Sequence, residues 1–290
     1  MPTDKHPRTR RWLRRTLGLG GGLAVATLGF FAWQTFYPVQ AASGWEYRVA
    51  HEHVLKAAAL SHDGAGNLLV SQELREGQGS ILRIAADGTR SLVVEGLSKP
   101  DGMLATTHGI AFSQEGGAAP VSLLGADGSV TALFDGINVQ GMWDDGQYLY
   151  TVEDRKGDGR LLRYEWASRR VEVLRANLSE AESLTRCADG RMFYTEKDKG
   201  VVRQLTQDAS DPVYLAGLNQ PSFLLCDSHG LWISEDATHR ARLLLATGEG
   251  APRTVLAYLK APQAILPLGG DRYLLAEGGR NRVLEFNLAP

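Results

Sequence analysis

The chain has 290 residues, of which 43% are hydrophobic and 22% charged, and this composition excludes an intrinsically disordered protein. Residues 1–15 hold six basic residues and one acidic residue, so the rest of the chain carries 25 basic and 32 acidic residues, a formal net charge of −7. Because the chain shows no basic patch with interleaved aromatic residues, we expect no nucleic-acid binding.

The first predicted element is an apolar helix. No charged residue stands between Thr16 and Trp45, and residues 16–37 are long enough to cross a bilayer. The basic segment 1–15 then predicts a cytoplasmic N-terminus, with the remainder in the bacterial periplasm. Two interpretations stay open: an anchor in the inner membrane, or a signal segment that is removed after export at the small residues of Val39–Ala41. Residues 38–44 are predicted to be a linker.

Residues 45–290 contain a sixfold repeat. Six apolar runs end in glutamate at intervals of 38 to 43 residues, at Glu73, Glu115, Glu153, Glu196, Glu235 and Glu277. A polar turn and a second apolar run follow each glutamate, and a third apolar run ends in Leu or Ile. A further short apolar segment stands before the run that ends in each glutamate. Four short strands in a unit of about 41 residues predict an all-β fold, a six-bladed β-propeller with four-stranded blades.

The two ends of the repeat predict how the ring closes. The last unit ends at "RVLEFNLAP" and lacks a fourth strand, whereas the alternating segment Trp45–Leu55 stands unassigned at the other end. We therefore expect the N-terminal segment to complete the sixth blade. A two-sheet sandwich, the alternative fold, does not explain the regular spacing.

Aligning the units predicts one residue per blade at the mouth of the central channel: Ala58, Asp101, Gln140, Glu182, Pro221 and Gln263. The residues that follow them are small, which would let backbones approach one another near the axis. They are Ala59, Gly102, Gly141, Ser183, Ser222 and Ala264.

Over about residues 45–290 the sequence resembles six-bladed propellers of the SMP-30/gluconolactonase/strictosidine-synthase-like and NHL-repeat kind. "KPDGM", residues 99–103, is similar to the Pro-Asp-Gly-Met element of the gluconolactonase branch, and "AEGGRNRVLEF" is similar to an NHL repeat. The resemblance implies that Asp101 binds a divalent metal. The other ligands of that branch, a first-blade glutamate and later asparagines, are absent here, since Ala58, Gln140 and Gln263 stand at the channel positions.

The channel residues themselves suggest a cation site. Two carboxylates and two amides, Asp101, Gln140, Glu182 and Gln263, supply the oxygen ligands that Ca²⁺ prefers. A bound cation would polarise a lactone or ester carbonyl while Glu182 activates water, which makes Asp101 and Glu182 the candidate catalytic residues. Gln140, Gln263, Ser183 and Ser222 are candidate ligand-binding residues. The alternative is that these polar groups bond only to one another and to water.

Two further features leave alternatives open. The six glutamates are best explained by turn capping or by ion pairs with basic residues near the next turn, such as Arg160, Arg203, Arg240 or Arg282, although Glu115 has no obvious partner. Cys187 and Cys226 each stand nine residues before a repeat glutamate, so they occupy equivalent positions on neighbouring blades and form either a disulfide or two buried thiols.

The sequence therefore leaves three functions open. The first is a metal-dependent hydrolase of a small lactone or ester at the channel mouth. The second is a non-catalytic, membrane-anchored propeller that binds a small ligand or a periplasmic or membrane protein. The third is a lyase or condensing enzyme like strictosidine synthase, with Glu182 as the base. Loops at the channel mouth set specificity, so the sequence does not name the substrate.

Overall fold

The computed structural model describes residues 7–248 and 250–289, apart from the side chains of residues 7–17 and 34–35. The chain divides into two compact units, residues 1–38 and 39–290. In the first, α1 (Pro7–Phe36) confirms the predicted helix. Over the described residues, no helix combines the length and the apolar character that crossing a membrane requires. Residues 1–6 of the predicted cytoplasmic segment lie outside the described residues, and the anchor or signal role of 16–37 stays a prediction.

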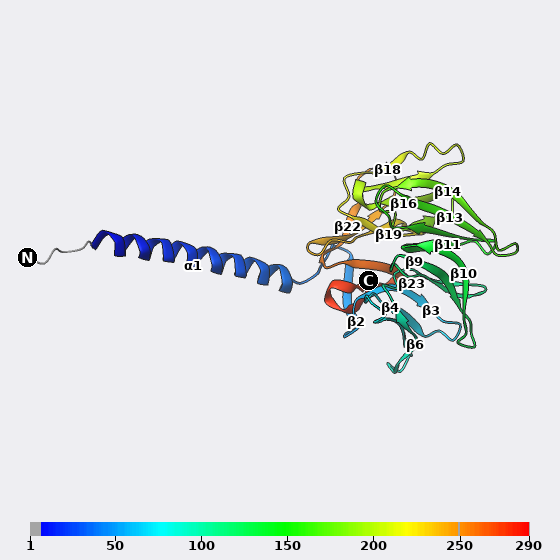
Figure 1. Ribbon diagram of the computed structural model, residues 1–290, viewed down its shortest axis with the longest axis horizontal. Coiled ribbons are helices and arrows are strands. Elements are labelled where there is room, and N and C mark those ends of the chain that lie inside the picture. The colour runs from blue at the N-terminus through cyan, green and yellow to red at the C-terminus, as the bar shows by residue number, and fades with distance from the viewer. Residues whose placement is uncertain (1–6, 249, 290) are drawn as a thin grey trace, which may run out of the picture. The chain divides into compact units, whose positions relative to one another are not determined.

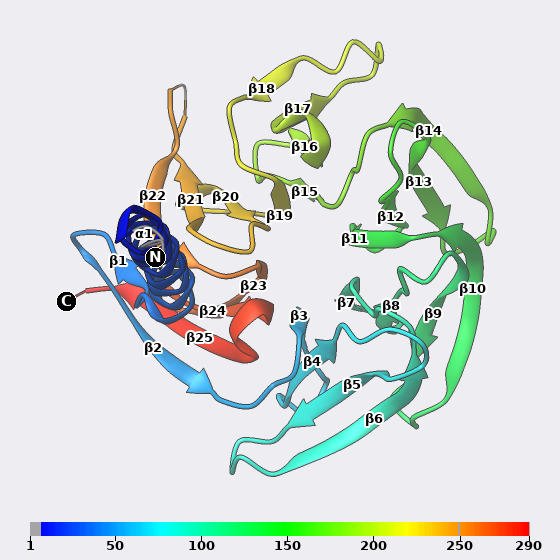
Figure 2. The same cartoon turned by 60° about the vertical axis from the view of Figure 1, so that its left-hand side comes forward.

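The second unit is a six-bladed propeller, as Figures 1 and 2 show. Each blade is an antiparallel sheet whose first strand lies nearest the central axis. The first three blades comprise β3 (Ala57–His62), β4 (Leu68–Gln72), β5 (Gly79–Ile84) and β6 (Arg90–Leu97); β7 (Met103–Thr106), β8 (Gly109–Phe112), β9 (Ala118–Leu124) and β10 (Val130–Ile137); and β11 (Val139–Asp144), β12 (Tyr148–Glu153), β13 (Gly159–Glu165) and β14 (Val171–Leu178).

The last three blades repeat this order, and two of them include a short 3₁₀ turn. They comprise β15 (Leu184–Arg186), β16 (Met192–Glu196), η1 (Lys197–Lys199), β17 (Val201–Leu205) and β18 (Val213–Leu215); β19 (Pro221–Asp227), β20 (Gly230–Glu235), β21 (Ala241–Ala246) and β22 (Arg253–Leu259); and β23 (Pro262–Gly269), β24 (Arg272–Glu277), η2 (Gly278–Arg280), β25 (Arg282–Leu288) and β2 (Trp45–His51).

The ring closes as the sequence predicts. Strand β2 pairs with β25 in antiparallel register, with Trp45 opposite Leu288 and Val49 opposite Leu284, so the two ends of the propeller share the sixth blade. One strand was not predicted. Within the segment expected to be a linker, 38–44, the short strand β1 (Gln40–Ala41) pairs with β22 and extends the fifth blade to five strands.

The hydrophobic core consists of six apolar layers, one between each pair of neighbouring blades. Between blades five and six, Trp232 is fully buried and packs edge-on against Trp45 at a centroid distance of 5.4 Å. Because the sheets pack face to face, their second strands are buried on both sides, which explains the nearly continuous apolar runs of these strands. The fourth strands β6, β10 and β14 are largely exposed.

The cysteines form a disulfide, which decides between the two alternatives. Cys187 and Cys226 are bonded, with their Cα atoms 5.1 Å apart, and they join the fourth blade to the fifth. Equivalent positions on adjacent inner strands come close enough for this geometry.

Candidate active site at the channel mouth

One backbone hydrogen bond recurs in all six blades and fixes which residues are equivalent. The amide after the second strand donates to the carbonyl of a residue just before the first strand, over 2.8 to 3.1 Å. Each carbonyl residue has a positive φ, between 41° and 55°. The donor–acceptor pairs are Glu73–Lys56, Glu115–Lys99, Asp154–Asn138, Lys197–Glu180, Asp236–Gln220 and Gly278–Ala261.

These bonds define two rings of side chains at one end of the channel, which we call the mouth. The outer ring consists of the six donor residues: Glu73, Glu115, Asp154, Lys197, Asp236 and Gly278. The inner ring stands two residues after each carbonyl: Ala58, Asp101, Gln140, Glu182, Ser222 and Gln263.

Five of the six channel positions predicted from the sequence are those of the inner ring. The exception is in the fifth blade, where Ser222 rather than Pro221 holds the position. The prediction failed there because the small residue expected after the channel position is Phe223 in this blade. In the third blade the small residue is required, because a Cβ on Gly141 would stand 2.5 Å from Cα of Ser183, on the next blade.

The six repeat glutamates occupy two structural positions, although the sequence repeat predicts one common position for all of them. Glu153, Glu196, Glu235 and Glu277 end the second strands, whereas Glu73 and Glu115 stand one residue later, in the outer ring. In the first two blades the position before the outer ring is taken by Gln72, which ends β4, and by Gln114, two residues after the end of β8. The sequence carries a signal of this shift, because only these two blades read Ser-Gln-Glu.

The four strand-end glutamates link neighbouring blades, as the predicted ion pairs suggest. Glu153 is fully buried, receives two hydrogen bonds from Arg160 at 2.6 and 2.7 Å, and accepts a third from the amide of Ile137 at the end of the preceding blade. Arg203 and Arg282 donate through Nε to Glu196 and Glu277, at 2.5 and 2.6 Å. The partner of Glu235 is Arg242, not Arg240 as expected.

The mouth is strongly acidic, and two lysines compensate part of its charge. The two rings contain six carboxylates and one lysine. Lys99 Nζ, from the residue that precedes the second blade, lies 3.2 Å from Glu73 and contacts Glu115. Lys197 Nζ lies 2.6 Å from Glu182 and 2.7 Å from Asp236.

Glu73, Asp101 and Glu115 form the tightest acidic group in the described part of the chain. One carboxylate oxygen from each lies within 4.8 Å of the others. The amide nitrogen of Gln140 donates to Glu115 at 3.0 Å and to Asp154 at 3.3 Å, which ties the group to the third blade. Asp101 is predicted here from the sequence, whereas Glu73 is grouped there with the ion-paired glutamates and Glu115 is left without a partner.

Burial and mutual repulsion raise the pKa values of acids at the mouth. The pKa of Asp101 is raised well above its usual value by burial, and the carboxylates of Glu73 and Glu115 raise it further. The pKa of Asp154 is raised to about 6 by burial and the nearby Glu115. Burial also raises the pKa of Glu182, against the opposing effect of the Lys197 ammonium.

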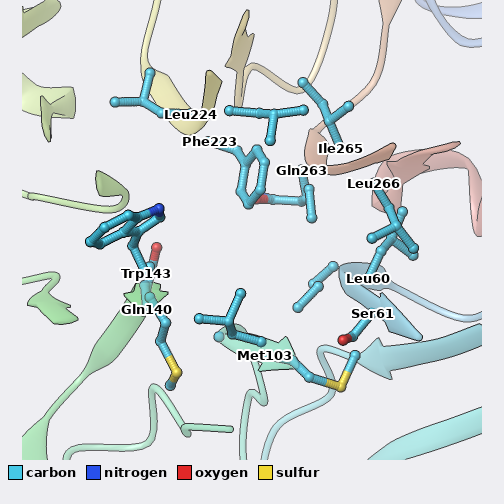
Figure 3. Close-up of a pocket in the computed structure, with 18 of the residues that line it drawn as sticks. Leu60, Ser61, Met103, Gln140, Trp143, Phe223, Leu224, Gln263, Ile265 and Leu266 are labelled. Carbon is cyan, nitrogen blue, oxygen red and sulfur yellow. The ribbon is translucent and has the colours of Figure 1, made fainter. Parts of the chain in front are cut away.

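Behind the mouth lies a cavity of about 290 Å³ formed by the inner strands of all six blades. Its rim is polar, with Asp101, Gln140, Glu182, Ser222 and Gln263. Its wall is mainly apolar and includes Leu60, Met103, Trp143, Phe223 and Ile265, which Figure 3 shows around one common space. Ser183 is absent from this wall, because its Oγ accepts a hydrogen bond from the Leu224 amide at 3.0 Å.

The donors at the mouth fit a hard divalent cation. The three clustered carboxylates are oxygen ligands of the kind that Ca²⁺ binds, and the Gln140 amide beside them presents its nitrogen to Glu115. Oδ1 of Asp154 is buried and makes no hydrogen bond, so the mouth also contains an unsatisfied acceptor. Of the four predicted metal ligands, Asp101 belongs to this group and Gln140 adjoins it. Glu182 is paired with Lys197, and Gln263 lies at the cavity rim.

No protein-family model matches the sequence, and no curated protein does. Solved structures do match. A gluconolactonase from Xanthomonas campestris is similar with a TM-score of 0.70 and 12% identity, over 86% of this chain and 91% of that one. A streptogramin B lyase has a TM-score of 0.62 and 14% identity, over 86% of this chain and 100% of that one. A chain of a nidogen/laminin complex has a TM-score of 0.59 and 16% identity, over 75% of this chain and 95% of that one. At these identities the likeness shows the fold: the chain is a six-bladed propeller similar in architecture to gluconolactonases and streptogramin B lyase.

Proposed function

We propose that this propeller is a divalent-cation-dependent hydrolase of a small lactone or ester that binds at the channel mouth. The observation that carries the proposal is the convergence of Glu73 and Glu115 on Asp101, which itself lies at the polar rim of an apolar cavity. Such a cavity, with a few polar groups at one end, is the usual form of a small-molecule site. The architectural likeness to a gluconolactonase supports the reaction class by analogy.

Three residues would hold the cation: Glu73, Asp101 and Glu115, with Gln140 beside them. A bound cation would supply the Lewis acidity that polarises an ester carbonyl. The chain's own residues account for the rest of the site. The apolar wall, including Met103, binds the carbon skeleton of the substrate and excludes water from its far side.

Glu182 is the proposed general base. Its side chain is 5% exposed and lies at the rim of the cavity. Burial makes its carboxylate more basic, and the bond from Lys197 at 2.6 Å fixes the position of one carboxylate oxygen. The second oxygen accepts the proton of a water molecule that attacks the substrate carbonyl.

The test is a hydrolysis assay of the full chain on a panel of aliphatic lactones and aryl esters. We expect Glu182→Gln to lower kcat by about 100-fold, because general-base catalysis is typically worth two to four orders of magnitude. Glu180→Gln is the matched control, since Glu180 stands two residues away and lies outside the cavity wall. Equal rates for both variants would remove Glu182 from the mechanism.

A second candidate is a non-catalytic propeller that binds a small molecule or a protein. The position of Lys99 favours it, because an ammonium already lies among the carboxylates of the mouth. The likeness to a chain of a nidogen/laminin complex, an assembly of proteins, points the same way. Absence of turnover across the panel, together with saturable ligand binding, would favour this function.

We also propose that the propeller is exported to the periplasm, either anchored at the inner membrane by residues 16–37 or released. The Cys187–Cys226 disulfide supports export, because structural disulfides persist in oxidising compartments. Digestion of intact cells and of spheroplasts with protease tests it. Cleavage of the propeller in spheroplasts alone is expected, whereas protection in both would place it in the cytoplasm.

A further inference from the structure

Lys99 places an ammonium group among the clustered carboxylates of the mouth. Its Nζ lies 3.2 Å from Oε1 of Glu73 and contacts the carboxylate of Glu115, and its side chain is 14% exposed. Burial favours the neutral form of Lys99, but the two glutamates and Asp101 outweigh it and raise the lysine's pKa. The ammonium therefore supplies positive charge at the place where a divalent cation would supply it.

The backbone holds Lys99 firmly in this position. Its amide donates to the carbonyl of Leu74 at 2.6 Å, and its own carbonyl accepts from the Glu115 amide at 2.8 Å. Its φ of 48° is the left-handed conformation shared by the equivalent residue of every blade. Anchored on both sides, the lysine reaches a carboxylate on the first blade and one on the second.

We propose that Lys99 is a tethered counter-ion that occupies the cation position, so that a divalent cation binds to Glu73, Asp101 and Glu115 only by displacing its ammonium group. This rests on the cation site of the proposed function and adds its regulation. Competition with a covalently attached charge lowers the affinity of the site for Ca²⁺, and the protein responds only to high cation concentrations.

Lys197 provides an internal comparison. It too joins two carboxylates of the mouth, Glu182 and Asp236, and its side chain is 17% exposed. The described residues show only the Glu73 group as a set of three clustered acids. Removing Lys197 therefore changes the charge of the mouth by the same amount without vacating a site that has three carboxylates.

The experiment is calorimetric titration of the full chain with CaCl₂, supported by thermal unfolding with and without Ca²⁺. We expect Lys99→Met to bind Ca²⁺ at least about tenfold more tightly than the wild type, because one nearby repelling charge is gone. Without Ca²⁺, the midpoint temperature of unfolding of Lys99→Met should be lower than that of the wild type. When Ca²⁺ is added, this midpoint should rise more in Lys99→Met than in the wild type. Lys99→Arg, which keeps the charge, should bind as weakly as the wild type.

A double variant separates occupancy from net charge. Lys99→Met combined with Glu73→Gln has the same formal charge in the cluster as the wild type, which also protects its folding. Tighter Ca²⁺ binding by this variant than by the wild type would support displacement of the ammonium. Ca²⁺ binding no tighter than that of the wild type in both Lys99→Met and the double variant would overturn the proposal, and so would an equal gain in Lys197→Met.

The outcome also distinguishes this proposal from the proposed function. Tight Ca²⁺ binding by Lys99→Met, together with wild-type hydrolysis that persists in chelator, would support the role of Lys99 and reject cation-dependent catalysis. Ca²⁺-dependent wild-type hydrolysis with no change of affinity in any Lys99 variant would reject the role of Lys99 and leave the function in place.

Discussion

Glu115 and Lys99 are joined twice. The amide of Glu115 donates to the carbonyl of Lys99 at 2.8 Å, and the Lys99 ammonium returns to the Glu115 carboxylate. The first bond recurs in all six blades and belongs to the architecture of the propeller. The second occurs where the mouth is most acidic, so the same pair of residues links the fold to the candidate site.

The strand-end glutamates should be essential for stability. In Glu153→Ala, Arg160 and the Ile137 amide lose the buried carboxylate that joins two blades, so we expect a loss of about 3 kcal/mol in the free energy of unfolding. Urea denaturation measures it. Glu172→Ala, which breaks the exposed pair with Arg163, should cost less than about 1 kcal/mol. Similar losses in both variants would contradict the assigned role.

The disulfide should stabilise the ring by a comparable amount. It closes a sequence separation of 39 residues, for which restriction of the unfolded chain predicts about 3–4 kcal/mol. The paired substitution Cys187→Ser, Cys226→Ser should lower the denaturation midpoint, and reducing agent should have the same effect on the wild type but none on the variant. An unchanged midpoint in the variant would show that the blades are held together without the bond.

Close approach of backbones at the axis predicts the effect of one added methyl group. In Gly141→Ala the new Cβ meets main-chain atoms of Glu182 and Ser183 within 2.6 Å, so the strands must shift, at a cost of about 1–3 kcal/mol. The shift should also impair ligand binding at the neighbouring mouth. Gly64→Ala, with open space around it, is the control. Equal stability of the two variants would disprove the crowding.

Asp154 predicts a pH dependence of stability with a definite sign. Its pKa is raised to about 6 from an ordinary value of 3.8, so the folded state holds this proton more tightly than the unfolded chain. The stabilisation is full below the unfolded pKa and is lost as pH rises through 6, up to roughly 2–3 kcal/mol. Asp154→Asn should therefore gain stability relative to the wild type between pH 4 and pH 7.5, as urea denaturation at both values would measure. A pH-independent difference would contradict the shift.

The fold was predictable because its signal is repeated six times. Each blade buries both faces, so apolar runs recur at a nearly constant interval. The unassigned segment that begins at Trp45 and the incomplete last unit that contains Leu288 together predicted the closing strand. Strand β1 was not predictable, because two residues at an outer edge carry no periodic pattern.

The site was only partly predictable, because its register depends on single residues. A shift of one position separates Glu73, which faces the mouth, from Glu153, which ends a strand, although both close an apolar run. An error of one position in the fifth blade likewise led the sequence alignment to Pro221, whereas Ser222 holds the channel position. Asp101 was found from a motif, but the approach of Lys99 to Glu73 joins different blades and follows from the packing of the ring rather than from local sequence.

The cation-dependent site is tested most directly by the rate of lactone or aryl-ester hydrolysis by the full chain as a function of free Ca²⁺, measured for the wild type and for Asp101→Asn. We expect the wild-type rate to rise with Ca²⁺ and to be abolished by chelator. In the variant, we expect a rate at least about 100-fold lower at any Ca²⁺ concentration. Turnover that ignores Ca²⁺ and persists in Asp101→Asn would contradict the claim that these carboxylates form a cation-dependent active site.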